Sequence, residues 1–174
     1  MILSGQTIRA RHFKKPLMKP FFERATAHGM SYGLGPAGYD VRLGTMRQHG
    51  PSGFGPTVDE ISLQPGGFAL GVTLEWMLIP ADLMGFVKDK SSWARKGICL
   101  QTTVIEPGWA GWLTLEITNH SAQPVRLMKG MPIAQIIFEL LDQPAEKPYR
   151  GKYNNQRNEP VEAIVERATS TVRA

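Results

Sequence analysis

Cysteine is nearly absent from this sequence, and its scarcity narrows the chemistry that the chain can perform. Cys99 is the single cysteine among 174 residues, so no internal disulfide and no cysteine-based zinc site can form. We expect Cys99, which lies inside an apolar segment, to be a small buried side chain. The four histidines lack the spacing of metal ligands and fall in predicted loops or termini, where surface positions are usual: His12, His28, His49 and His120. The sequence therefore predicts a protein without zinc.

Long apolar runs are also missing. No segment approaches the ~20 consecutive apolar residues that span a bilayer. The opening residues MILSGQTIRARHF contain no apolar core of the kind found in secretion signals. We accordingly expect a soluble, cytoplasmic protein without a membrane partner.

Charge is modest and dispersed. Lys and Arg number 20 against 15 Asp and Glu, a balance that favours an anionic partner without identifying it. The basic residues form no long run and no repeat with aromatic residues, the pattern typical of proteins that bind single-stranded nucleic acid. A nucleic-acid partner is not expected.

What the chain does contain is a series of short β-type segments separated by Gly and Pro. With this length, the pattern predicts one all-β domain over residues 1–174, either a sandwich, a jelly roll or a distorted barrel. We expect an exposed loop at 46–57 and a tight hairpin that turns at 106–109. The predicted strands are 40–44, 61–63, 68–79, 85–90, 98–105, 110–118, 125–128 and 132–141.

Both ends of the chain differ from this pattern. Ser4 is a candidate cap for a short helix over 5–12, and residues 1–35 are expected to be peripheral. Residues 142–174 read as a polar tail that can close over a ligand, because 152–156 form a dense cluster of hydrogen-bond donors. A short helix is predicted from Pro160 onward.

The segment from Lys88 to Thr118 concentrates the polar groups that can do chemistry. Alternation along its last strand puts Glu116 on a polar face and Leu115 on the core face. A sheltered Glu116 can take a proton from water, and Arg95 on the preceding turn can bind phosphate oxygens. The same residue types also fit a solvated arginine and an ordinary exposed strand glutamate, so the residue types alone leave both interpretations open.

Six motifs extend the picture from single residues to most of the chain. They are GPAGYDVRLG, LQPGGFALGVTLEWMLIPADLMGF, KDKSSWARKG, TTVIEPGWAGWLTLEI, KGMPIAQIIFELL and GKYNNQ, and they span about 36–157. In these motifs and their order the chain resembles the dCTP deaminase and dUTPase superfamily. The resemblance implies a β-clip, a distorted dUTPase-like jelly roll, that assembles as a homotrimer with active sites between subunits.

The resemblance also implies an activity. Glu116 stands ten residues after the hairpin acid Glu106, where deaminases carry their catalytic glutamate, and KYNNQ is similar to the closing motif of deaminases. The implied reaction is attack of water on C4 of dCTP, with Glu116 as base and with Ser91 and Arg95 holding the attacking and leaving groups. Mg²⁺ would be bound through the triphosphate. The implied substrate-binding residues are Lys90, Ser92, Thr103, Val104, Glu106, Trp109, Thr114, Leu115, Tyr149, Lys152 and Gln156.

Three alternatives remain beside deamination of dCTP to dUTP. The enzyme could be bifunctional and continue to dUMP, or it could be a dUTPase-like diphosphatase, which the short segment between Gly97 and Glu106 favours. It could also be an inactive nucleotide-binding regulator. This last alternative is allowed by two departures from the family: Glu106 and Lys90 stand where the family usually has Asp and Arg. Lys cannot bind an anion through two parallel hydrogen bonds as Arg can.

Overall fold

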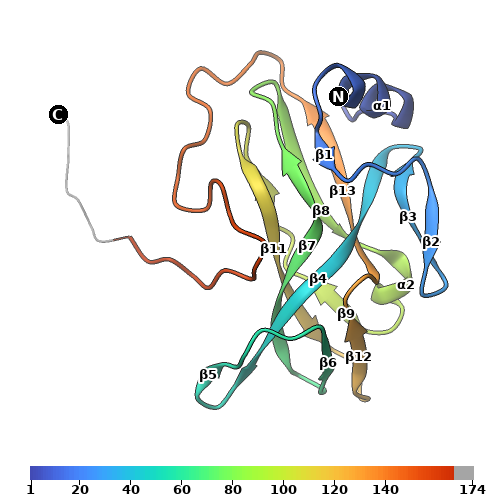
Figure 1. The fold of residues 1–174 in the computed structure, drawn as a ribbon, viewed down its shortest axis with the longest axis vertical. Helices are drawn as coiled ribbons and strands as arrows, with labels where there is room; N and C mark the ends of the chain where they lie inside the picture. The colour runs from blue at the N-terminus through green and yellow to red at the C-terminus, as the bar shows by residue number, and fades with distance from the viewer. Residues whose placement is uncertain (167–174) are drawn as a thin grey trace.

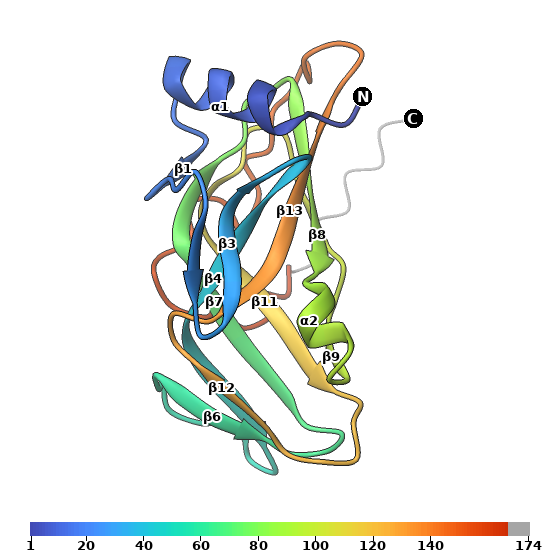
Figure 2. The ribbon, with the colours of Figure 1, turned by 90° about the vertical axis from the view of Figure 1, so that its right-hand side faces the viewer.

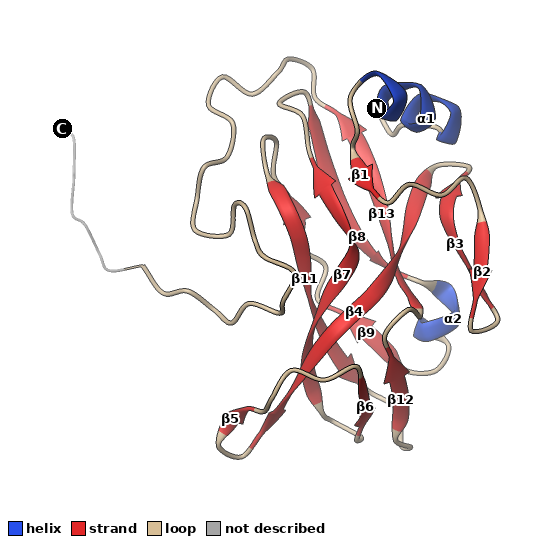
Figure 3. Cartoon of the chain, in the orientation of Figure 1, coloured by secondary structure: helices blue, strands red, loops and turns tan. Residues whose placement is uncertain are grey.

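Strands dominate the structure, a computed structural model that describes residues 1–166 (Figures 1 and 3). The two helices are α1 (Gly5–Lys14) and α2 (Ser91–Ala94). The strands are β1 (Met18–Lys19), β2 (Ala25–Ala27), β3 (Met30–Gly35), β4 (Gly38–Gly50), β5 (Gly53–Phe54), β6 (Glu60–Leu63), β7 (Phe68–Leu78), β8 (Leu83–Asp89), β9 (Ile98–Leu100), β10 (Val104–Ile105), β11 (Ala110–Asn119), β12 (Val125–Met128) and β13 (Pro132–Leu140).

One large antiparallel sheet organises the chain. Its main order is β10-β8-β13-β4-β7-β11-β9, and β1, β2, β3 and β5 pair beside this path. A separate pair, β6 with β12, lies at the end of the molecule opposite α1 (Figure 2). The long strands β4 and β7 pair at the centre of this sheet, and β11 pairs with β7. The position of a side chain on β11 is therefore fixed relative to both central strands.

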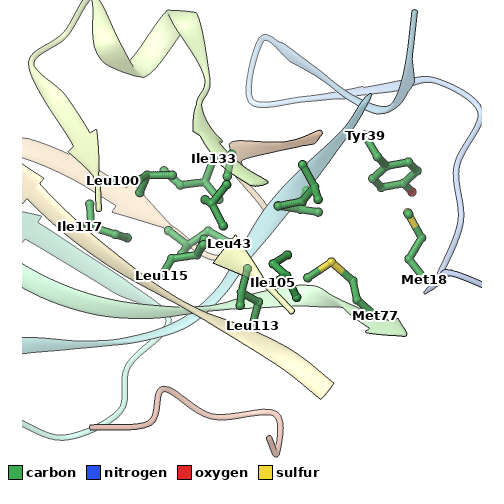
Figure 4. Close-up of a cluster of buried hydrophobic side chains, with 14 of the residues drawn as sticks. Met18, Tyr39, Leu43, Met77, Leu100, Ile105, Leu113, Leu115, Ile117 and Ile133 are labelled. Carbon is green, nitrogen blue, oxygen red and sulfur yellow. The ribbon is translucent and has the colours of Figure 1, made fainter. Parts of the chain in front are cut away.

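The core lies where the inner faces of these strands meet (Figure 4). Along β11 the side chains of Leu113, Leu115 and Ile117 are buried, and those of Trp112 and Glu116 are partly exposed, as the period of a strand requires. Thr114 is the exception: it lies on the face of Glu116 but is 6% exposed, because Gln156 and Val161 of the tail bond to it. The predicted alternation therefore holds except at Thr114, and Glu116 lies on the face that points away from the core.

An ion pair is built into this core between the two central strands. The carboxylate of Glu75 on β7 is fully buried and accepts from the backbone N–H and the Nε–H of Arg42 on β4, both at 2.8 Å. Burial raises the pKa of Glu75, and the bonds from Arg42 oppose that rise. The backbone N–H and the Nε–H of Arg42 each satisfy one oxygen of a carboxylate that could not otherwise remain there.

Two sequence predictions about strands are wrong. Residues 46–57 are not simply an exposed loop, because β4 continues to Gly50 and turns back through β5. The hairpin predicted around 106–109 is divided: β9 pairs with β11, whereas β10 pairs with β8. Residues 101–103 separate the two segments and let the chain change partners.

The opening segment is more integral than expected. The predicted helix is present as α1, but the hydroxyl of Ser4 lies 3.0 Å from the Thr7 hydroxyl and does not cap the helix. Ile8, Leu17 and Met18 are fully buried or nearly so. Residues 1–35 thus contribute to the core instead of lying only at the periphery.

Three smaller expectations also change. His12 is buried, not a surface residue, and its Nδ1 accepts from the backbone N–H of Leu17 at 3.3 Å. Cys99 is only partly buried. Residues 161–166 form no helix, and the rest of the helix predicted after Pro160 lies outside the described residues.

Candidate functional site

A cavity of about 410 Å³ lies between β11, the segment before it, the β4–β5 hairpin and the C-terminal tail. Its volume is within the range of small-molecule sites. Its wall consists of Phe54, Phe68, Leu70, Thr103, Val104, Ile105, Glu106, Trp109, Leu113, Thr114, Glu116, Tyr149, Tyr153, Gln156, Val161, Glu162 and Ala163.

Glu116 is the acid at the centre of the predicted chemistry, and it lies in this wall. Its register partner on β7 is Leu70, another wall residue, so the carboxylate stands beside an apolar neighbour. Burial raises the pKa of Glu116, and a hydrogen bond from its own backbone N–H partly opposes the rise. A glutamate in this environment exchanges a proton nearer neutral pH than a solvated one does.

The charge of the wall is entirely negative. Glu106, Glu116 and Glu162 line the cavity, and no Lys or Arg of residues 1–166 lines it. The apolar and aromatic part suits the uncharged portion of a ligand. An anionic portion would need cations that this wall does not provide.

The basic and hydroxyl groups predicted to act with Glu116 lie elsewhere in the chain. Ser91, Ser92 and Arg95 belong to α2 and its C-terminal boundary, which lies on the opposite side of the molecule from the tail (Figure 1). Arg95 donates to the carbonyl of Ser91 at 3.3 Å. A single chain therefore does not place the Arg95 guanidinium beside Glu116.

Lys90 already has a partner. Its Nζ lies 2.6 Å from Oδ2 of Asp40 on β4, and both side chains are largely buried. The ammonium group has further N–H donors, but its position is set by Asp40. Lys90 thus forms a structural ion pair with Asp40 and is also a candidate phosphate contact.

The tail is fixed to the segment before β11 by backbone and indole groups. The N–H of Tyr149 donates to the carbonyl of Pro107 at 2.7 Å, and Nε1–H of Trp109 donates to the carbonyl of Tyr153 at 2.6 Å. Oδ1 of Asn154 accepts from the N–H of Ala110 at 2.9 Å. These bonds hold the donor-rich segment of the tail against the cavity.

Gln156 continues this attachment along β11. It forms a parallel bridge with Gly111, whose φ of +139° favours glycine and where an added Cβ would lie 2.7 Å from the Gln156 nitrogen. Oε1 of Gln156 accepts from the N–H and the hydroxyl of Thr114, both at 3.2 Å, and the Thr114 hydroxyl accepts from the N–H of Val161 at 3.1 Å. The tail therefore covers the cavity of its own chain.

The structure gathers eight of the predicted residues in one wall and leaves six outside it. Those in the wall are Thr103, Val104, Glu106, Trp109, Thr114, Glu116, Tyr149 and Gln156. Those outside are Lys90, Ser91, Ser92, Arg95, Leu115 and Lys152. Leu115 is in the core, so only its backbone can reach a ligand. Lys152 lies on the tail, where its Nζ donates to the carbonyl of Ile164.

The backbone of Thr103 is less available than expected. Its N–H donates to the carbonyl of Gln101 at 2.9 Å, and its carbonyl accepts from the N–H of Val87 at 3.2 Å. Val104 beside it is 45% exposed and lines the cavity. Recognition of a ligand through the backbone of Thr103 is therefore limited to the remaining capacity of its carbonyl oxygen.

Sequence reasoning missed the apolar half of the wall. The sequence predicts Phe54 in an exposed loop and Phe68 and Leu70 in a strand, with no sign that the three residues line one cavity. Tyr153, within the donor cluster, was not singled out. Tyr153 lies in a turn, where the sequence has no strand or helix periodicity that could indicate which way its side chain points.

Residues 1–166 contain neither a metal-binding cluster nor a membrane-spanning helix. No three His, Cys, Asp or Glu side chains come together in a group that could hold a metal ion. Within the same residues, no helix has the length and apolar character needed to cross a membrane.

Residues 55–141 match a protein-family model described as dCTP deaminase-like. Among curated proteins, the dCTP deaminase of Thermococcus gammatolerans is 39% identical over 147 residues, which cover 83% of this chain and 87% of the relative. The "dCTP deaminase, dUMP-forming" of Methanopyrus kandleri is 37% identical over 165 residues, covering 80% and 81%.

A solved structure shares the fold. The crystal structure of 2'-deoxycytidine 5'-triphosphate deaminase from Agrobacterium tumefaciens matches with a TM-score of 0.62 and 25% identity over 80% of this chain. The chain spans about half of that structure, 47% of its length. The predicted all-β, dUTPase-like distorted jelly roll is confirmed.

Proposed function

The chain belongs to the dCTP deaminase-like family, and from this membership and the site we propose that it is an enzyme that hydrolyses dCTP to dUTP and ammonia. The overall step consumes one water and breaks the bond between C4 and the exocyclic amino group. The observation that carries the proposal is the position of Glu116 in the cavity wall, half-buried and with a raised pKa. That carboxylate is suited to accept a proton from the attacking water and to return it to the leaving amine.

Ser91 and Arg95 would complete the site from a neighbouring subunit. Within one chain they lie away from the cavity, whose wall has three carboxylates and, among the described residues, no Lys or Arg. In a homotrimer with sites between subunits, Arg95 of one copy would meet Glu116 of the next. The guanidinium would then favour the ionised carboxylate, and Ser91 would orient the water.

The nucleotide would lie with its base toward Glu116. Trp109 and Glu106 would flank the deoxyribose, and backbone groups of Thr103, Val104, Thr114 and Leu115 would contact the base. The triphosphate would extend toward cations and hydroxyls outside the wall. These residues are Lys90, Ser92 and Lys152, with Tyr149 and Gln156 holding the closed tail.

Mg²⁺ would arrive with the nucleotide and belong to the substrate. Phosphate oxygens are suitable Mg²⁺ ligands, so the triphosphate itself would hold the ion. The chain would contribute the surrounding cations and leave the coordination to phosphate and water.

One assay tests the proposal directly. The purified protein is incubated with dCTP and Mg²⁺, the nucleotides are separated, and ammonia and pyrophosphate are measured. Ammonia without pyrophosphate supports deamination to dUTP. Binding of dCTP without any turnover would contradict it and leave a nucleotide-binding regulator, and pyrophosphate from dUTP alone would indicate a diphosphatase.

A second candidate is supported by one relative. The Methanopyrus kandleri protein, 37% identical to this chain, is named as forming dUMP. A bifunctional enzyme would release ammonia and pyrophosphate together from dCTP. The same assay distinguishes it from the simple deaminase by the ratio of the two products.

A further inference from the structure

Arg47 on β4 connects two parts of the cavity wall that are far apart in sequence. On the hairpin side, its Nε–H donates to the carbonyl of Gly55 at 2.9 Å and its Nη2–H to the carbonyl of Phe54 at 3.3 Å. On the tail side, its Nη1–H donates to Oε1 of Glu162 at 2.6 Å. The guanidinium also lies over the Phe54 ring, 5.7 Å from its centroid.

Two of the three partners of Arg47 line the cavity. Phe54 comes from the β4–β5 hairpin and Glu162 from the tail, and no other side-chain hydrogen bond joins these two segments among the described residues. Near Glu162, the N–H of Val161 donates to the Thr114 hydroxyl at 3.1 Å, and the N–H of Ile164 donates to the Tyr153 hydroxyl at 3.0 Å. The ion pair therefore lies within the stretch of tail that covers the cavity.

We propose that Arg47 is a positioning residue that ties residues 161–164 to the β4–β5 hairpin and so keeps the cavity around Glu116 closed. The inference rests on the proposed function only for its kinetic consequence. Arg47 also balances the charge of Glu162, one of three carboxylates in the wall. An unbalanced Glu162 would repel an anionic nucleotide at the point where the tail meets it.

The planar guanidinium is suited to this task and an ammonium is not. Its fixed set of donors reaches two backbone carbonyls and a carboxylate at once, and its face packs on an aromatic ring. Lysine at position 47 would retain the charge beside Glu162 but lose the simultaneous bonds to Phe54 and Gly55. Arg47→Lys is therefore expected to hold the tail less well than arginine and better than Arg47→Gln.

Amide hydrogen exchange in the full chain without nucleotide tests the closure. The reporters are the N–H groups of Val161 and Ile164, which exchange only when residues 161–164 release the hydroxyl oxygens of Thr114 on β11 and of Tyr153 within the tail. Arg47→Gln and Glu162→Gln should each raise the exchange rates about two- to fivefold, the range expected for a partly exposed ion pair. The double variant should exceed Arg47→Gln little, because both changes remove the same bond.

Arg126→Gln is the matched control. Arg126 forms a similar exposed pair with Glu60, Nε to Oε1 at 2.5 Å, between β12 and β6, and neither residue lines the cavity. Its substitution should leave exchange at Val161 and Ile164 unchanged. Wild-type exchange rates at both amides in Arg47→Gln and Glu162→Gln would overturn the proposal. Glu162→Gln keeps the hairpin bonds of Arg47, so a folding defect cannot imitate the result.

The kinetic readout separates closure from chemistry. If dCTP is the substrate, Arg47→Gln should raise KM two- to fivefold, because losing closure weakens binding of substrate and transition state alike, and kcat should remain within about twofold. A reduced kcat with unchanged KM would contradict a positioning role. Faster exchange in a protein that does not deaminate dCTP would retain the closure role and refute the proposed function alone.

Discussion

The indole N–H of Trp109 donates to the carbonyl oxygen of Tyr153 at 2.6 Å, so a residue beside β11 holds the middle of the C-terminal tail. Trp109 is 4% exposed, so without its indole N–H the carbonyl of Tyr153 would lose this hydrogen bond. Trp109→Phe retains an aromatic ring and removes the donor. We expect KM for dCTP to rise about fivefold, the equivalent of one hydrogen bond, with the fold retained. Steady-state kinetics and far-UV circular dichroism would measure the two effects.

Glu116→Gln should abolish ammonia release. The amide has the shape of the carboxylate but cannot serve as a base, so dCTP affinity should remain within about tenfold of wild type. Turnover is measured by ammonia release and affinity by calorimetry with dCTP. Undiminished turnover in this variant would remove Glu116 from the mechanism.

The pH dependence of activity should reflect the ionisation of Glu116. Burial raises the pKa of Glu116, and Arg95 of the next subunit would oppose only part of that rise, so kcat/KM should fall with decreasing pH at values above that of an ordinary glutamate, near 4.5. A profile whose acid limb coincides with that of a solvated carboxyl group would show that the base is not sheltered.

The free energy of unfolding should respond to Glu116 in the opposite direction from activity. A raised carboxyl pKa means that the folded protein holds the proton more tightly than the unfolded chain. Its stabilising contribution is therefore present at low pH and lost as pH rises through the folded-state pKa. In a dissociated subunit, where no neighbouring Arg95 faces Glu116, Glu116→Gln should be more stable than wild type at pH 8, by less than about 1 kcal/mol because solvent screens the half-buried group. The difference should shrink toward pH 4, as urea denaturation at both pH values would measure.

The buried pair of Glu75 and Arg42 should dominate the stability of the central strands. Glu75→Leu leaves the Arg42 guanidinium without its carboxylate and the Arg42 N–H without an acceptor, and should cost about 3–5 kcal/mol of unfolding free energy. Arg42→Met/Glu75→Leu should recover much of that loss, because two apolar groups replace two charges. Urea denaturation of both variants checks the order, and a double variant no more stable than Glu75→Leu would contradict it.

Mixing two inactive variants tests whether the site is shared. Arg95→Ala and Glu116→Gln subunits are each expected to lack activity alone. In randomly assembled mixtures, about a quarter of sites between subunits would combine an intact Arg95 with an intact Glu116. Recovery of a comparable fraction of wild-type ammonia release supports a site formed by two copies. No recovery from oligomers shown to contain both variants would place both residues in one subunit or exclude Arg95.

Sequence patterns located most strands and the face of Glu116, because alternation reports directly which side chains enter the core. β11 shows this in Leu115 and Ile117, which are buried on either side of the more exposed Glu116. The pattern failed where strands do not keep one partner. β4 runs on through Met46 and Gly50 despite its polar and glycine content, since β7 and β5 pair with it.

The site was harder to predict than the strands because its wall is assembled from distant segments. The position of Phe54 depends on the β4–β5 hairpin, and that of Glu162 on a tail without regular structure. The engagement of Lys90 with Asp40, fifty residues away in the chain, leaves no local signal. Residue type identified Glu116 as a candidate, but only the fold shows that it is enclosed by the tail of its own chain.

The contact between Gly111 and Gln156 has a consequence for solubility. Residues 110–114 hydrogen-bond to β7 on one side, and the tail occupies the other side of the strand at Gly111 and Trp112. An uncovered strand edge, with its unpaired N–H and C=O groups, is a template for pairing with another molecule. A chain cut before Tyr149 should therefore self-associate as well as lose its cover over the cavity, because the same segment shields an adhesive backbone.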